Sequence, residues 1–123
     1  SGGSNRAKVN KNQSLKNRKK LLLDNVIKSN QSNVASAWSN LQSSESLLTS
    51  VRSQVKAAEI ANEGISAEYE RGSGRTTLDV IQSNALLLNA QISLANSERN
   101  YVLAQYNLLK SIGLLNSTYL KLK

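Results

Sequence analysis

The sequence predicts an all-α fold, a long antiparallel coiled-coil hairpin of two helices. The 123-residue chain contains no proline, the residue that most strongly interrupts a helix. Gly72 and Gly74 form a glycine-rich break between two long stretches without such a break. Apolar and small side chains recur every seven residues on both sides of it, as in helices that pack side by side.

The first helix is expected over about residues 5–70, from two heptad series offset by three residues. The first runs through Ile27, Val34, Leu41, Leu48, Val55, Asn62 and Tyr69, and the second through Asn30, Ala37, Ser44, Val51, Ala58 and Ile65. Such an a/d pattern is typical of coiled-coil packing. At 1.5 Å per residue, the helix would be about 95 Å long.

A turn over about residues 71–75 and a second helix over about 76–112 follow. Gly72 and Gly74 can take positive φ, Thr76 or Thr77 can cap the helix, and Asp79 suits its dipole. One heptad series is Ile81, Leu88, Ala95, Val102 and Leu109; another, apolar throughout, is Val80, Leu87, Leu94, Tyr101 and Leu108. A face this broad indicates neighbours on two sides. Gly113 is expected to end the helix, leaving a short segment, 113–123.

Folding the chain at Ser73 predicts a register in which facing residue numbers add up to about 146. Ile65 would then face Ile81, Ala58 would face Leu88, and Val51 would face Ala95. Residues 5–33 would have no partner in the second helix over about 42 Å, so another surface must cover them.

The net charge of +8 is concentrated near the beginning of the chain. Residues 1–28 contain one acid, Asp24, and eight basic residues, which are Arg6, Lys8, Lys11, Lys16, Arg18, Lys19, Lys20 and Lys28. A basic end can bind nucleic acid or anionic lipid, although a solvated helix face is the simplest interpretation. No aromatic side chain lies in this run to stack on a base.

Enzymatic chemistry is not expected. The chain has no cysteine and no histidine, which removes the usual zinc ligands and the commonest general base. It has no nucleophile beside a base and no phosphate-binding loop, so we expect no catalytic residues, no cofactor and no metal. No run of about 18 apolar residues predicts a membrane span, and no signal peptide is expected.

Motifs in a particular order resemble the TolC family of trimeric outer-membrane efflux channels over essentially the whole chain. They are Ser1-Gly2-Gly3, then Tyr69, Gly72, Arg75-Thr76 and Asp79-Val80-Ile81, the run from Leu87 to Tyr101, and LKSIGL at Leu109–Leu114. Two features depart from the family pattern. The loop from Tyr69 to Asp79 is one residue longer, and Gln82 stands where some members have an acid.

The resemblance implies that residues 1–123 form a periplasmic helical hairpin, the second of two repeats in each chain of a trimer. The hairpin would be a stave of an α-barrel below an outer-membrane β-barrel whose strands, like the first repeat, are missing here. The implied partners are two further copies of the chain, a periplasmic adaptor protein and an inner-membrane pump, with no nucleic acid. The implied place is the periplasmic part of an outer-membrane protein in the Gram-negative envelope.

The resemblance also implies roles for residues of the turn. Asp79 would stand in a ring of carboxylates that constricts the entrance. Tyr69 and Arg75 would form a latch to the neighbouring hairpin. Gly72, Ser73 and Gly74 would contact the adaptor.

Two alternatives remain open at this point. The chain could be a free coiled-coil interaction module, such as a periplasmic adaptor hairpin, although the Arg-Leu-Ser-like tip expected of those is not present. It could also be a basic nucleic-acid-binding helical hairpin that uses residues 6–28, which strongly salt-dependent affinity for DNA would support.

Overall fold

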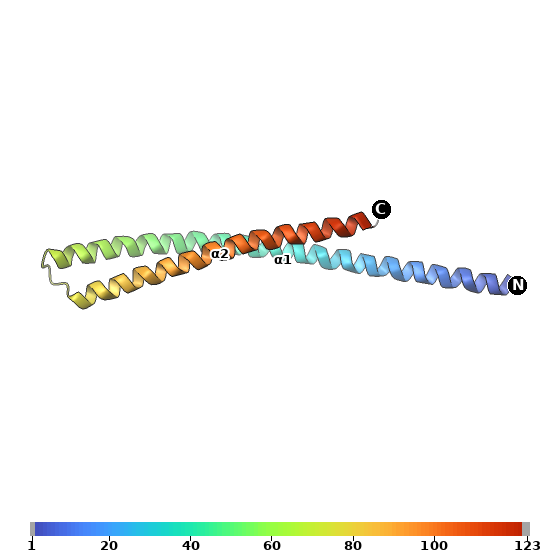
Figure 1. The fold of residues 1–123 in the computed structure, drawn as a ribbon, viewed down its shortest axis with the longest axis horizontal. Helices are drawn as coiled ribbons and strands as arrows, with labels where there is room; N and C mark the ends of the chain where they lie inside the picture. The colour runs from blue at the N-terminus through green and yellow to red at the C-terminus, as the bar shows by residue number, and fades with distance from the viewer. Residues whose placement is uncertain (1, 122–123) are drawn as a thin grey trace. The chain divides into compact units, whose positions relative to one another are not determined.

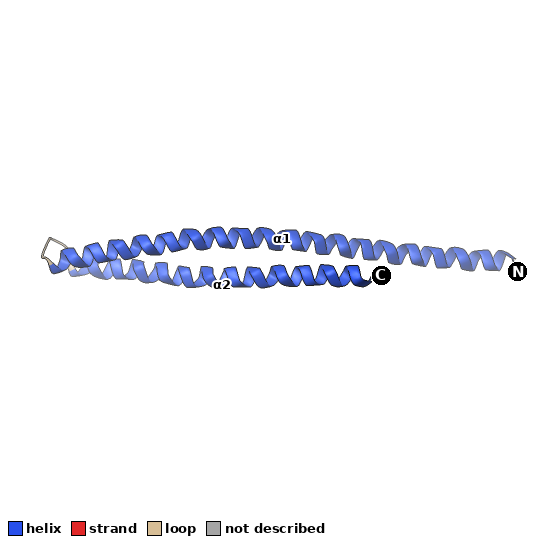
Figure 2. Ribbon diagram, turned by 90° about the horizontal axis from the view of Figure 1, so that it is seen from above, coloured by secondary structure: helices blue, strands red, loops and turns tan. Residues whose placement is uncertain are grey.

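The computed structural model describes residues 2–121, which form two helices joined by a short turn (Figure 1). Helix α1 is Gly2–Glu70, 69 residues long, and helix α2 is Thr77–Lys121, 45 residues long. Figure 2 shows helices and the connecting turn but no strand in this part of the chain. The all-α prediction is therefore confirmed. Gly2 and Gly3 lie in the first turn of α1, and Ser1 lies outside the described residues.

The chain divides into two compact units. One unit is residues 39–106, in which the second half of α1, the turn and most of α2 form a hairpin. The other consists of residues before 39 together with residues from 107 onward. Each unit contains segments of α1 and of α2.

The buried face of α1 is the one that the heptads predicted. In residues 39–70, the buried or half-buried positions include Leu41, Ser44, Leu48, Val51, Val55, Ala58, Asn62 and Ile65. Ile27, Asn30, Val34 and Ala37 continue the same spacing in the other unit. Tyr69, the last member of the first series, is exposed. Apolar side chains are sparse on α1, so their period identifies its buried face without ambiguity.

The predicted contact face of α2 is wrong by one residue. Ile81 and Leu88 are 57% and 56% exposed, and Val102 and Leu109 are exposed as well. The positions that turn toward α1 are instead Val80, Ser83, Leu87, Ala90, Leu94, Ser97, Tyr101, Ala104, Leu108 and Ser111. When the buried positions of the two helices are paired in order from the turn, the two residue numbers of each pair add up to 145 rather than 146. The hydrogen bond between Asn62 and Ser83 joins one of these pairs.

Small side chains explain why this face of α2 is chosen. Large residues such as Leu87 and Leu94 alternate with Ser83, Ala90 and Ser97, so two helix backbones can approach closely between the large side chains. Ser83 and Ser97 are buried, and no buried side-chain nitrogen or oxygen atom of the described residues is without a hydrogen bond. The Asn62 side-chain amide donates to the Ser83 hydroxyl at 3.1 Å and to Asn84 Oδ1 at 2.7 Å, which forms a polar layer near the turn.

Gly113 does not end α2, contrary to expectation, and residues 113–121 are helical rather than a separate segment. Its φ is not positive, and a helical glycine costs about 1 kcal/mol relative to alanine, which further packing can offset. That packing includes hydrogen bonds from Asn30 Nδ2 to Thr118 Oγ1 at 2.8 Å and from Gln31 Nε2 to the Tyr119 hydroxyl at 2.9 Å. The uncovered part of α1 is therefore shorter than predicted: residues 3–22 are all exposed, whereas half-buried positions begin at Leu23.

No helix within residues 2–121 combines the length and apolar character needed to cross a bilayer.

The corrected register can be tested with pairs of cysteines. Ala58→Cys with Leu87→Cys should form a disulfide readily on mild oxidation, because both positions belong to the buried strip of the hairpin. Ala58→Cys with Leu88→Cys is the matched control and should form at least tenfold less, since Leu88 points to solvent. Gel mobility under non-reducing conditions measures both. Preferential crosslinking of 58 with 88 would restore the register that adds up to 146.

Candidate functional site

The end of α1 at the turn is closed by a Schellman motif. The Ser73 N–H donates to the Glu68 carbonyl at 2.9 Å, and the Gly72 N–H donates to the Tyr69 carbonyl at 3.1 Å. Gly72 has a φ of 71° and Gly74 a φ of 86°, values at which a side chain would be strained. The two glycines are thus required by the backbone of the turn, and Gly72, Ser73 and Gly74 are all exposed at its apex.

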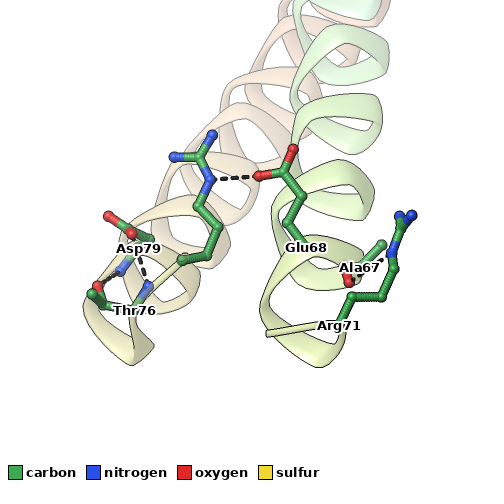
Figure 3. Close-up of polar contacts among 6 residues, drawn as sticks. Ala67, Glu68, Arg71, Thr76 and Asp79 are labelled. Atoms are coloured by element: carbon green, nitrogen blue, oxygen red, sulfur yellow. Dashed lines mark hydrogen bonds and ion pairs between the residues drawn. The ribbon is translucent and has the colours of Figure 1, made fainter. Parts of the chain in front are cut away.

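The beginning of α2 is closed by a reciprocal capping box. The Asp79 N–H donates to Thr76 Oγ1 at 3.2 Å, and the Thr76 N–H donates to Asp79 Oδ2 at 2.9 Å (Figure 3). These hydrogen bonds to Thr76, followed by the charge of Arg75, lower the pKa of the Asp79 carboxyl below its ordinary value. Asp79 is therefore held as a carboxylate at the N-terminus of a helix, where negative charge is favourable.

Arg75 makes an ion pair with a residue that the sequence analysis did not single out. Its Nε donates to Glu68 Oε2 at 2.6 Å across the turn, and both side chains are partly exposed. The hydrogen bond and the negative charge of Glu68 raise the pKa of Arg75. This pair joins the last turn of α1 to the segment before α2, and no pattern in the sequence identifies Glu68 as the partner.

Tyr69 also bonds within the hairpin. Its hydroxyl lies 3.2 Å from Thr77 Oγ1, so it connects the end of α1 to the first residue of α2. Arg71, the other arginine of the turn, donates from Nε to the Ala67 carbonyl at 3.2 Å and extends back along α1 (Figure 3). The two predicted latch residues thus bond to groups of this same hairpin, and Arg71 bonds to its own helix instead.

A half-open groove of about 270 Å³ lies beside these residues. Arg75 and Asp79 are among the residues that line it, with Ala58, Ala61, Ile65 and Leu86. Part of the lining is thus small or apolar, and another part carries one positive and one negative charge. A groove of this kind can receive a side chain that carries an apolar body and a polar end.

The predicted site residues therefore separate into two groups. Tyr69, Arg75 and Asp79 are brought together at the junction of the two helices, while Gly72, Ser73 and Gly74 stand apart at the apex. Sequence reasoning missed Glu68, and it did not recognise that Thr76 and Asp79 match the spacing of a capping box. Among the described residues, no cluster of acids could hold a metal ion.

Comparison with known proteins gives three similar sequences. The outer membrane efflux protein BepC of Brucella suis biovar 1 (strain 1330) is 30% identical over 122 residues, which is 99% of this chain and 26% of BepC. The outer membrane proteins TolC of Escherichia coli (strain K12) and of Salmonella enteritidis are 32% and 30% identical over 83 residues, 68% of this chain and 17% of each relative. The chain thus spans about a quarter or less of the length of these relatives. No protein-family model and no solved structure matches it.

The capping box predicts a pH dependence with a defined sign. Because the pKa of Asp79 is lowered in the folded chain, its contribution to stability is present above the ordinary aspartate pKa. It is lost as the pH falls through the lower, folded-state value. Wild type should therefore melt above Asp79→Asn at pH 7, and the difference should shrink toward pH 2.

Thermal unfolding followed by circular dichroism measures this difference. Asp24→Asn, the same chemical change on an exposed part of α1, is the control and should leave the melting temperature nearly unchanged at pH 7. Thr76→Ala removes the other half of the box and should cost about 1 kcal/mol. If the difference in melting temperature between wild type and Asp79→Asn stayed constant from pH 7 to pH 2, that would contradict this role of Asp79.

Proposed function

Because the chain belongs to the TolC family of outer membrane efflux proteins, we propose that it forms a stave of a trimeric channel for efflux or secretion. Relatives that carry "outer membrane" in their names support placing the hairpin in the periplasmic part of such a protein. The chain would pack against neighbouring hairpins to close a helical barrel. Its tip would form the entrance of the channel and the contact with a periplasmic adaptor protein, to which an inner-membrane pump also binds.

A second apolar line on α2 is the observation that carries this proposal. Its members are Leu78, Ile81, Ala85, Leu88, Ile92, Ala95, Val102 and Tyr106, all of them exposed. They follow each other mostly at spacings of three and four, on the side of the helix roughly opposite its contact with α1. We call this set the outer apolar line. A regular apolar stripe without a partner marks an interface, and a stave with a neighbour on each side requires one.

Asp79 is the candidate for the constriction of the entrance. It lies within the first turn of α2, close to the tip, and its lowered pKa keeps it charged at neutral pH. In a symmetric trimer, three copies of this carboxylate would approach the axis and favour cations there. The capping box does not exclude this role, because Thr76 occupies only Oδ2 among the hydrogen bonds found, and a carboxylate accepts about four.

Arg75 and Tyr69 are the candidates for a latch to the neighbouring hairpin. Within this chain Arg75 bonds Glu68 through Nε, while a guanidinium has five N–H donors in all. The same side chain can therefore hold Glu68 and reach an acceptor on a neighbour. Such a charge-assisted bond is stronger than one between neutral groups, so opening would have to break it.

The apex and the groove are the candidates for adaptor contact. Gly72, Ser73 and Gly74 present exposed backbone at the end of the hairpin. The groove beside Arg75 and Asp79 offers room for a side chain from a partner helix that approaches this end. Contact here would place the adaptor next to the latch and the constriction, where its binding could change the state of the entrance.

Self-association through the outer apolar line can be measured directly. The triple variant Ile81→Ser, Leu88→Ser and Ile92→Ser should weaken association of the chain at least tenfold in sedimentation equilibrium, because it removes three exposed apolar side chains from one stripe. The matched control, Leu47→Ser, Ile60→Ser and Leu86→Ser, removes three exposed apolar side chains elsewhere and should have little effect. A wild-type chain that stays monomeric at high concentration would argue against the stave.

The entrance can be tested in the full-length protein in a planar bilayer. Arg75→Ala should raise single-channel conductance, since it removes the proposed latch. Asp79→Asn should lower cation selectivity without opening the entrance, because asparagine keeps an oxygen that can cap α2. Arg71→Ala, which alters the neighbouring arginine that bonds its own helix, is the control. Unchanged conductance in Arg75→Ala together with unchanged selectivity in Asp79→Asn would show that the tip has only a structural role as a turn.

A further inference from the structure

The two long edges of the hairpin formed by residues 39–106 differ in charge. Along one edge, each helix has a line of exposed, uncharged residues that follow each other at spacings of three and four. The line on α1 is Asn40, Ser43, Leu47, Ser50, Gln54, Ala57 and Ala61, and the line on α2 is Gln82, Leu86, Asn89, Ser93, Asn96, Asn100 and Leu103. We call these two lines together the uncharged edge.

The groove at the turn shows that both lines belong to the same edge. Ala61 from α1 lines it together with Gln82 and Leu86 from α2, so the two helices present these residues on one side of the hairpin. Asp79 lines the groove as well, and it precedes Gln82 by three positions, on the same side of α2. The uncharged edge therefore begins beside Asp79 and runs away from the tip.

Charged side chains of the same helical stretches avoid this edge. Within residues 40–61, the charged side chains follow each other at spacings of seven, four and three, along the other side of α1. They are Glu45, Arg52, Lys56 and Glu59. On α2, Glu98 lies on that other edge too, while Arg99 falls on the outer apolar line, four positions after Ala95. The hairpin thus has one charged and one uncharged edge.

The proposed barrel gives each side of the hairpin a different surrounding. The outer apolar line takes the contact with a neighbouring hairpin, which leaves the two long edges to face water. One of them faces the conduit and the other faces the outside of the barrel. Asp79, the candidate for the constriction around the axis, stands in line with the uncharged edge.

We propose that the uncharged edge lines the conduit, so that a solute meets the fixed charge of this hairpin at the tip and then a wall of amides and hydroxyls. This inference rests on the proposed channel function and adds the chemistry of the wall. Asparagine and glutamine side chains carry both donors and acceptors, so they can hydrogen-bond polar solutes of either charge. Residues 39–106 would thus sort solutes by charge at the tip and not along the wall.

The length of α2 separates the tip electrically from the wall. Asn96 lies about 25 Å along the helix from Asp79, at 1.5 Å per residue. The Debye length in 0.1 M salt is about 10 Å, so the field of Asp79 is largely screened at that distance. A carboxylate introduced at Asn96 would therefore act on passing ions independently of Asp79.

Introduced charge tests which edge faces the conduit, in the full-length protein in a planar bilayer. Asn96→Asp should raise the permeability ratio of potassium to chloride at least about twofold, because it adds a ring of carboxylates to the wall. Gln91→Glu is the matched control, since it also converts an exposed amide of α2 to a carboxylate, but on the charged edge. It should leave the ratio unchanged. An equal or larger rise with Gln91→Glu would overturn the proposal.

A rescue experiment separates this inference from the role of Asp79. In the Asp79→Asn background, Asn96→Asp should restore preference for potassium, whereas Gln91→Glu should not. Failure of Asn96→Asp to restore it would overturn the uncharged edge as the wall. Wild-type protein that conducts no current would instead overturn the proposed channel function itself.

Chemical modification gives a second measurement that does not depend on selectivity. This chain has no cysteine, so a single cysteine can be introduced into it without background from its other residues. A negatively charged methanethiosulfonate reagent should change the single-channel conductance of Asn89→Cys and leave that of Gln105→Cys, an exposed position on the charged edge, as it was. The reverse result, in a protein that conducts, would overturn this inference and leave the proposed channel function intact.

Discussion

The contact between α1 and α2 is a strip only two heptad positions wide. The stability and the association of the chain depend on how little apolar surface that strip buries. Its buried apolar members are Ala37, Leu48, Val51, Val55, Ala104 and Leu108, and no side chain of the described residues is fully buried. Serines and an Asn62 layer occupy several of the remaining positions. Such a seam gives close packing and a defined register but modest stability, so the outer face of α2 is left to add burial with a neighbour.

Heptad periodicity predicted the hairpin and the buried face of α1, but it did not predict the buried face of α2. On α1 apolar side chains are sparse, so only one period is visible. On α2 the series that contain Val80 and Ile81 are offset by a single residue and are almost equally apolar. Which one turns inward depends on the small residues beside it, and only the facing helix reveals that fit. The prediction that α2 ends at Gly113 was wrong for a related reason. Packing of the helical turns after Gly113 outweighs the low helix propensity of glycine.

At the turn, Tyr69, Arg75 and Asp79, which the sequence resemblance named, each make a contact within the hairpin, and their proposed roles toward a neighbour stay predictions. Thr76 and Asp79 have the spacing of a capping box, so the hydrogen bonds between them could have been predicted from the sequence. The partners of Arg75 and Tyr69 could not be predicted in this way. A long exposed side chain can bond any group within a few ångströms, and the path of the turn is unknown from the sequence. Glu68 and Thr77 became evident as those partners only when the turn placed them there.

The bonds at the turn also constrain how a channel entrance could work. Each of the Arg75, Tyr69 and Asp79 side chains is already oriented by an intrachain contact, so the tip is organised before any neighbour arrives. Arg75 and Asp79 retain unused donor or acceptor capacity. A neighbour would therefore add bonds to a preformed tip instead of ordering a flexible loop. Opening would then separate hairpins from one another while each turn keeps its structure, which favours movement of intact staves over local unfolding.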